Sequence, residues 1–109
     1  MTEDAYGSYV ELVRVHEDGS VVIAVHGDLS RLNAGAFIDY ICAFGLERSA
    51  VVLDMGDTTF VDAEGVEAML ASQRRLVDHG SQLTLRNPRP TVMRLLHVLG
   101  CEDRFSVET

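Results

Sequence analysis

The sequence contains no lysine, and its nine basic residues are all arginine, against 17 aspartates and glutamates. The resulting net charge of −8 repels nucleic-acid phosphates and anionic lipids, which argues against a nucleic-acid or membrane-surface partner. The missing lysine also argues against a receiver module of the response-regulator type, because such a module needs a lysine beside its phosphorylated aspartate.

Long apolar runs and paired cysteines are absent too. No run approaches the roughly 20 apolar residues that a membrane-spanning helix needs. The first residues, MTEDAYGSY, lack the basic start and apolar middle of a secretion signal, so we expect a cytoplasmic protein. Cys42 and Cys101 have no CxxC spacing, and we expect them to be small core residues rather than a disulfide.

The usual signatures of catalysis are missing as well. The sequence has no Gly-x-Ser-x-Gly elbow, no P-loop and no Gly-x-Gly-x-x-Gly fingerprint. Its four histidines show no metal-ligand spacing. We therefore expect neither enzyme activity nor a cofactor or metal.

One acidic set needs separate consideration: Asp54, Asp57, Asp62 and Glu64. Such carboxylates can hold Mg²⁺ at the end of a strand. Structural roles are favoured instead, because Asp62 is placed to cap a helix and Glu64 suits the positive end of that helix.

What is present predicts one globular domain over residues 9–109, preceded by a flexible tail at residues 1–8. Hydrophobic residues make up 47% of the 109, which is enough for a core of its own. Residues 9–16 roughly alternate between polar and apolar, Asp18-Gly19 signals a turn, and residues 20–26 resume strand character. This pattern predicts an N-terminal antiparallel hairpin.

The rest of the chain alternates helices with strands. Helical stripes begin at Ala34, with Ser30 or Asn33 as the cap, and at Ala63, with Asp62 as the cap. A third stripe of Val92, Leu95, Leu96 and Leu99 follows Pro90. Strands are expected at 50–55, buried on both faces, at 82–86, and as a short last segment at 105–107. Residues 56–59 read as a turn, after which Phe60 and Val61 re-enter the core.

This order predicts an α/β fold: a small mixed sheet, with an antiparallel hairpin and then parallel strands, flanked by helices. The turn from Asp62 to Gly65 joins a strand end to a helix start, where sites form in open α/β sheets.

Three segments resemble the STAS domain of bacterial anti-sigma factor antagonists. Residues 27–30 (GDLS) resemble the family's Gly-x-Leu-Asp stretch in shifted form. Residues 51–55 with 59–66 resemble its central signature, Val-x-Leu-Asp-Leu followed by Phe-Ile-Asp-Ser-Ser-Gly-Leu. Residues 86–88 with the Leu95–Gly100 ending resemble its last third. The resemblance covers nearly the whole chain and implies the STAS fold.

The resemblance implies a switchable binding protein. Family members bind a kinase-type anti-sigma factor and so release the sigma factor. The kinase phosphorylates the Ser or Thr before the signature glycine, which adds about −1.5 to −2 charge to the contact surface and breaks the complex.

The sequence departs from this pattern at the phosphoacceptor position. Glu64 precedes Gly65, and Ala63 precedes Glu64, so neither residue offers a hydroxyl to a kinase. Glu64 either mimics the phosphorylated state in part or leaves binding permanently on. Thr58 and Thr59 are the nearby hydroxyls that remain as alternative acceptors.

We therefore predict a transcription-regulating interaction module that binds an anti-sigma factor. Its contact surface is expected to comprise Asp28, Ser30, Thr58, Asp62, Ala63, Glu64 and Gly65. The alternative is a sensor module that binds a nucleotide or another small ligand near the turn between Asp54 and Glu64. The oligomeric state is left open by the sequence.

Overall fold

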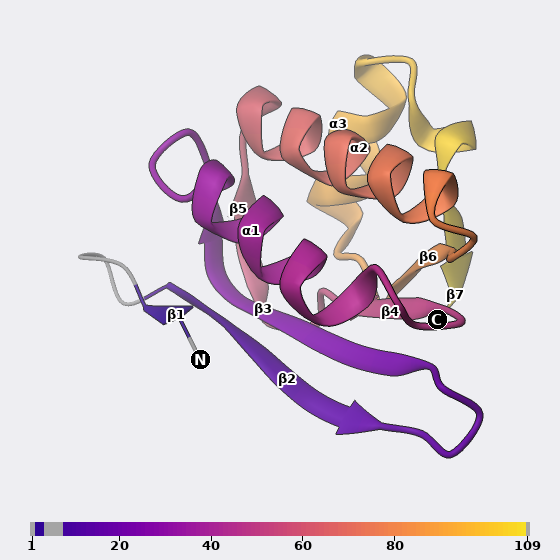
Figure 1. Ribbon diagram of the computed structural model, residues 1–109. Helices are drawn as coiled ribbons and strands as arrows, with labels where there is room; N and C mark the ends of the chain where they lie inside the picture. The colour runs from indigo at the N-terminus through magenta and orange to yellow at the C-terminus, as the bar shows by residue number, and fades with distance from the viewer. Residues whose placement is uncertain (1, 4–7, 109) are drawn as a thin grey trace.

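The structure is a computed structural model that describes residues 2–3 and 8–108. The described residues form a seven-stranded sheet with helices packed on it (Figure 1). The strands are β1 (Thr2–Glu3), β2 (Tyr9–Val15), β3 (Val21–Leu29), β4 (Val51–Asp54), β5 (Thr58–Val61), β6 (Leu83–Arg86) and β7 (Ser106–Glu108). The helices are α1 (Ala34–Gly45), α2 (Ala63–Asp78), α3 (Pro90–Val98) and the short 3₁₀ helix η1 (Glu102–Arg104).

The predicted N-terminal hairpin is confirmed by the antiparallel pairing of β2 with β3. At its turn, Asp18 accepts hydrogen bonds from the N–H and the hydroxyl of Ser20, and these bonds lower the pKa of the Asp18 carboxyl. β1 pairs antiparallel with β2 in a segment where the sequence predicted only a tail. The remainder of that predicted tail, apart from Ser8, lies outside the described residues.

The strands run in the order β1-β2-β3-β4-β6-β7, and every pairing from β3 onward is parallel. The mixed sheet predicted from the sequence is therefore confirmed. The pairing of β7 with β6 also confirms the short last strand.

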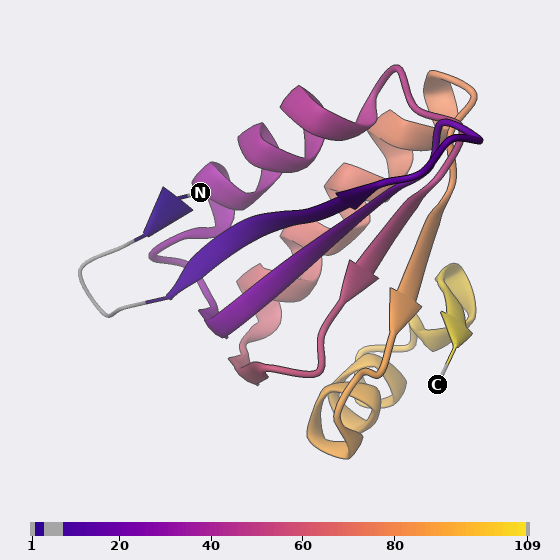
Figure 2. The ribbon, with the colours of Figure 1, turned by 90° about the horizontal axis from the view of Figure 1, so that it is seen from below.

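Burial on both faces of β4 was predicted, and this prediction is wrong. Val51 and Leu53 are fully buried, whereas the alternate residues of the strand, Val52 and Asp54, are partly exposed. Figures 1 and 2 show the reason, since α1 and α2 lie on the same face of the sheet. The core fills the space between that face and these helices, and its largest fully buried members include Ile23, Phe37, Ile41, Leu53, Met69 and Leu85.

The segment after β4 differs most from the prediction. Residues 58–59 belong to β5 rather than to a turn, and β5 pairs in parallel with the end of β3, through Gly27↔Thr58 and Leu29↔Val61. Val61 is buried as predicted, but Phe60 is 53% exposed, so its predicted place in the core is wrong. β5 is irregular at this point, because Asp28 pairs with Phe60 while Thr59 is skipped, and both Thr59 and Phe60 are exposed.

The starts of α1 and α3 lie where the sequence predicted them, but some of the residues at their ends have other roles than expected. Asn33 stands at the start of α1, but its side chain accepts from the N–H of Ser30 and donates to the carbonyl of Asp28 instead of capping the helix. α3 begins at Pro90 as predicted, although Leu99 at the end of its apolar stripe is 45% exposed. Both cysteines are free thiols.

Candidate functional site

The start of α2 is fixed to the loop after β3 by the side chain of Asp62. One carboxylate oxygen accepts a hydrogen bond from the N–H of Gly65 at 2.7 Å, which is the predicted N-cap, and the other accepts from the N–H of Arg31 at 3.2 Å. The first N–H groups of a helix have no partner within the helix, so this carboxylate stabilises the helix start. The two loops therefore form one continuous surface.

Gly65 allows the first turn of α2 to lie directly against the end of β3. The glycine is buried, and a Cβ atom at this position would lie 2.3 Å from the carbonyl oxygen of Leu29. The same oxygen accepts a hydrogen bond from the N–H of Asp62 at 3.3 Å. Because the obstacle is backbone, a side chain at residue 65 would force the helix away from the strand.

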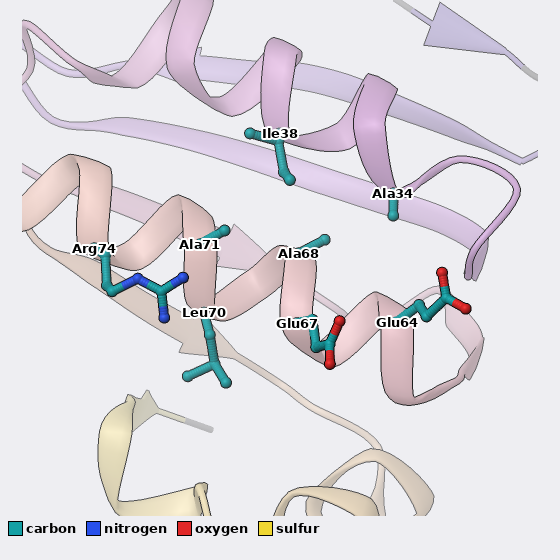
Figure 3. A pocket seen from close by; sticks show the side chains of 8 residues that line it. All are labelled: Ala34, Ile38, Glu64, Glu67, Ala68, Leu70, Ala71 and Arg74. Carbon is teal, nitrogen blue, oxygen red and sulfur yellow. The ribbon is translucent and has the colours of Figure 1, made fainter.

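Ala63 and Glu64, the two residues before this glycine, are exposed. Glu64 lies at one end of a groove of about 460 Å³ between α1 and α2 (Figure 3). The groove is lined by Ala34, Ile38, Glu64, Glu67, Ala68, Leu70, Ala71 and Arg74. The carboxylates of Glu64 and Glu67 lie near the start of α2, and the guanidinium of Arg74 lies further along the helix. The groove thus has charged ends and a mostly apolar middle.

Asp28 and Ser30 belong to the same surface. Both are half-buried, and the carboxylate of Asp28 accepts a hydrogen bond from the hydroxyl of Thr59 at 3.2 Å. Ser30 accepts from the N–H of Leu32 and precedes Arg31, whose N–H binds Asp62. The loop after β3 and the start of α2 thus bring together Asp28, Ser30, Asp62, Ala63 and Glu64.

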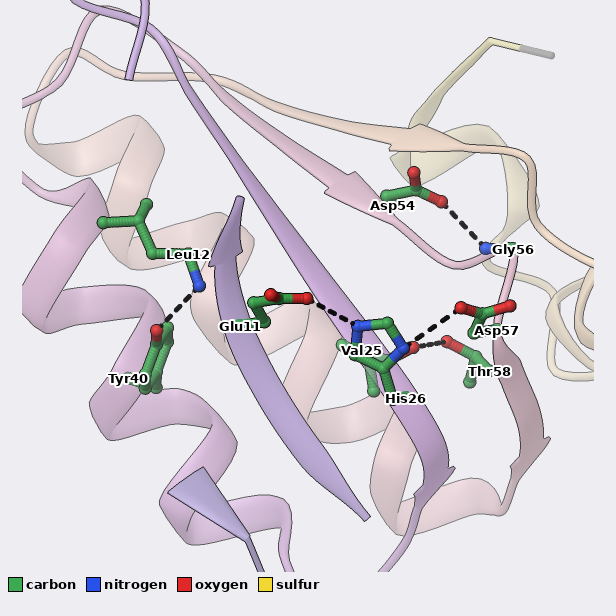
Figure 4. Close-up of polar contacts among 9 residues, drawn as sticks. All are labelled: Glu11, Leu12, Val25, His26, Tyr40, Asp54, Gly56, Asp57 and Thr58. Carbon is green, nitrogen blue, oxygen red and sulfur yellow. Dashed lines mark hydrogen bonds and ion pairs between the residues drawn. The ribbon is translucent and has the colours of Figure 1, made fainter. Parts of the chain in front are cut away.

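The remaining two predicted contact residues, Thr58 and Gly65, are buried inside the domain. Thr58 is fully buried, and its hydroxyl donates to the carbonyl of Val25 at 2.9 Å (Figure 4). In this arrangement its side chain cannot meet a partner or a kinase, which corrects its assignment to the contact surface. Gly65 is buried for the packing reason given above. Thr59, the other candidate hydroxyl, is exposed.

The acidic set considered for Mg²⁺ is divided between two places. Asp54 and Asp57 line a hollow of about 390 Å³ on the uncovered face of the sheet, together with Glu11 and His26, whereas Asp62 caps α2. His26 lies between Glu11 and Asp57, at 3.0 and 3.1 Å from their carboxylates (Figure 4). Within the described residues, no group of three or more histidine, cysteine or acidic side chains is arranged to hold a metal ion.

Sequence reasoning missed two parts of these surfaces. Glu67, Ala71 and Arg74 follow Glu64 at helical spacing, so their shared face could have been found from the periodicity of α2. The position of His26 between two carboxylates depends on the pairing of β2 with β3 and on the loop after β4. No pattern among residues that are close in the sequence predicts that His26 lies between these two carboxylates.

Comparison with known proteins places these features in a family. A family model described as "Mlab, STAS domain" matches residues 13–108. The anti-sigma factor antagonist SpoIIAA of Bacillus, solved in unphosphorylated and phosphorylated forms, superposes in its unphosphorylated form with a TM-score of 0.75 at 22% identity, covering 93% of this chain and 89% of that one. An anti-sigma factor antagonist from Mycobacterium paratuberculosis gives a TM-score of 0.79 at 20% identity, covering 97% and 89%. These likenesses show a shared fold.

The fold also occurs as a small part of much longer proteins. A probable sulfate transporter from Arabidopsis thaliana is 29% identical over 103 residues, which are 84% of this chain and 16% of the transporter. The chain therefore spans about one sixth, or less, of the curated relatives that it matches. Over the part of the chain that the structure describes, no helix is both long and apolar enough to cross a bilayer.

Proposed function

The chain belongs to the STAS domain family, and from that premise we propose that it is a protein-binding module that docks an anti-sigma factor through the surface around the start of α2. The observation that carries the proposal is the exposure of Glu64, which stands before Gly65 where the family resemblance places the phosphoacceptor. The module works by binding rather than by catalysis, and it acts in transcription regulation in the cytoplasm.

The contact surface that we propose consists of Asp28, Ser30, Asp62, Ala63 and Glu64. Asp62 holds the two contributing loops together through its bonds to Gly65 and Arg31. A surface held in this way loses little conformational freedom when a partner binds, and that favours affinity. The groove between α1 and α2 continues from Glu64 and offers further contact area.

We further propose that the module has no phosphorylation switch at residue 64. Glutamate carries one negative charge that no kinase adds and no phosphatase removes, whereas a phosphate brings about −1.5 to −2. The hydroxyl of Thr58 is buried and already bonded to Val25. Among the nearby residues, that leaves Thr59 as the exposed hydroxyl.

The contact role of Glu64 is tested by reversing its charge. In isothermal titration calorimetry against the anti-sigma factors of the same organism, Glu64→Arg should change the dissociation constant at least tenfold, or about 1.4 kcal/mol. The matched control is Glu17→Arg, which alters another exposed glutamate at the turn of the β2–β3 hairpin and should bind as the unaltered chain does. Unchanged affinity in Glu64→Arg would remove Glu64 from the interface.

The sign of the effect of Glu64 is measured with Glu64→Ser in the same titration. Tighter binding by this variant means that the carboxylate opposes the partner, as a partial mimic of phosphate would. Weaker binding means that the carboxylate itself contacts the partner. Incubation of the unaltered chain with the partner kinase and ATP should leave residues 57–66 free of phosphate by mass spectrometry, and phosphate there would refute the absence of a switch.

A second candidate function is the binding of a small polar ligand. The hollow on the uncovered sheet face favours it, because Asp54, His26 and Asn87 all line a space of about 390 Å³. Its acidic side chains disfavour an anionic ligand unless Mg²⁺ accompanies it. A thermal-shift screen of nucleotides with and without Mg²⁺ is the test, since a ligand at 100 times its dissociation constant stabilises by about 2.7 kcal/mol.

A further inference from the structure

A second groove lies between β5 and α3, and neither Asp62 nor Glu64 lines it. It has a volume of about 450 Å³ and is lined by Thr59, Phe60, Val61, Thr91, Val92, Arg94, Leu95 and Val98. Two of its large apolar side chains are unusually open to solvent, because Phe60 is 53% and Val98 72% exposed. Clustered apolar surface of this kind marks interaction sites more often than single exposed side chains do.

One wall of the groove is formed by three consecutive residues of β5, 59–61. The strand is irregular where it pairs with β3, because Gly27 pairs with Thr58 and Asp28 with Phe60, so Thr59 is skipped. Thr59 and Phe60 are both exposed there, whereas Val61 is buried. The opposite wall is one face of α3, because positions 91, 92, 94, 95 and 98 recur at helical spacing.

The edge of β5 that faces away from β3 has no paired strand among the described residues, where β5 pairs with β3 alone. Asp62 donates its N–H to the carbonyl of Leu29 in β3. Backbone groups alternate in direction along a strand, so the N–H and C=O of Val61, one residue earlier, point away from β3. An unpaired edge beside an apolar groove is a ready template for another strand.

The groove also carries an unusual charge for this chain. Arg94 is its one charged lining residue, although the whole chain has a net charge of −8. In residues 2–3 and 8–108, the side chain of Arg94 makes neither an ion pair nor a hydrogen bond. A cation without a partner beside apolar side chains fits an occupant that combines apolar residues with one carboxylate.

From this arrangement we propose that the groove between β5 and α3 binds an extended apolar segment of a partner protein. The segment adds as a strand to the free edge of β5, packs its side chains on Phe60, Leu95 and Val98, and places an acidic residue against Arg94. This is the combination of main-chain pairing and side-chain pockets by which sheet edges bind peptides.

The size of the groove favours a peptide over a second copy of this chain. β5 has four residues, which in extended form span about 13 Å. Stable interfaces between whole proteins use about 20–30 residues from each side, whereas eight residues line this groove. A short extended segment fills such a site.

The test uses labelled peptides of about seven residues, alternating valine and threonine, with one glutamate placed at each position in turn. Binding is followed by fluorescence anisotropy and by amide signals in ¹H–¹⁵N spectra. At least one peptide should bind and shift the signals of β5 and α3. Phe60→Ser and Arg94→Glu should each weaken that binding at least tenfold, and a lysine in place of the peptide's glutamate should restore binding to Arg94→Glu.

Matched controls separate this site from the surface around α2. Val15→Ser, which alters an exposed valine of the hairpin, and Glu64→Arg should both bind the peptide as the unaltered chain does. A proline at the centre of the peptide should abolish binding, because it removes a main-chain donor. The proposal is overturned if no peptide binds at about 1 mM, if the proline peptide binds equally well, or if sedimentation shows a dimer that Phe60→Ser dissociates.

Discussion

Residues 64 and 65 are neighbours under opposite constraints. Glu64 projects into solvent from the first turn of α2, and the packing of the domain places no demand on its side chain. Gly65 touches the backbone of β3 and has no space for a side chain. The interaction of Glu64 with the positive end of the helix contributes only about 0.3–1 kcal/mol to folding stability. Stability therefore places little constraint on which residue stands at position 64.

The constraint on Gly65 gives a prediction about stability. Gly65→Ala should lower the free energy of unfolding by about 1–3 kcal/mol, because the new methyl group meets the carbonyl oxygen of Leu29 and neither backbone can yield easily. Chemical denaturation measures the change. The control is Gly35→Ala in the first turn of α1, where a Cβ meets nothing within 4 Å. That variant should be neutral or slightly more stable, since alanine favours helix. Equal effects of the two substitutions would contradict the packing argument.

Among the elements, those with local signals were predictable and those defined by distant partners were not. α2 carried an acidic cap and a regular apolar stripe, and its predicted start at Ala63, with Asp62 as the cap, is confirmed. β5 exists because Thr58 and Val61 pair with the far end of β3, about 30 residues earlier in the chain. In the sequence its two threonines follow Gly56 and Asp57 and therefore resembled a turn.

The same distinction between local signals and distant partners applies to the residues of the candidate site. The adjacency of Asp62, Ala63 and Glu64 was readable from the sequence, because a cap and the helix turn that follows it are local features. The burial of Thr58 was not, because it depends on the hydrogen bond to Val25 across two strands. The groove beside α3 was missed since the exposure of Phe60 follows from the same long-range pairing.

At the end of α3, an ion pair gives a prediction about pH. The hydrogen bond between His97 and Glu102, at 2.7 Å, and the charge of that carboxylate raise the pKa of His97 above its ordinary value. The raised pKa means that the pair stabilises the contact between α3 and η1 below the ordinary pKa of histidine, and that this contribution is lost as the pH rises through the raised value. An NMR titration should find the raised pKa, and Glu102→Gln should lower it toward the ordinary value of histidine, because the hydrogen bond and the largest charge contribution are removed. An unchanged titration in that variant would contradict the assignment.

On the scale of the whole molecule, α1 and α2 cover only one face of the sheet, so the groove between these helices and the hollow beside His26 lie on opposite sides of the sheet. α1 and α2 cover one face and present Glu64 with the groove between them, while the uncovered face holds the hollow beside His26. The groove at β5 and α3 uses the edge of the sheet. The two grooves and the hollow share no lining residue, so each can be tested by substitutions that leave the others unaltered.

The net charge of −8 leads to a prediction about salt. Arg86–Glu108 is the one ion pair between an arginine and a carboxylate in the described part of the chain, so added salt has little attraction to weaken there and much repulsion to screen. Raising sodium chloride from about 20 to about 200 mM at pH 7 should raise the midpoint of thermal unfolding by a few degrees. Near the sequence pI of about 4.7 the same change should have little effect, because the net repulsion has gone. A midpoint that falls with salt at pH 7 would mean that local attraction, rather than the overall negative charge, dominates the electrostatics of the fold.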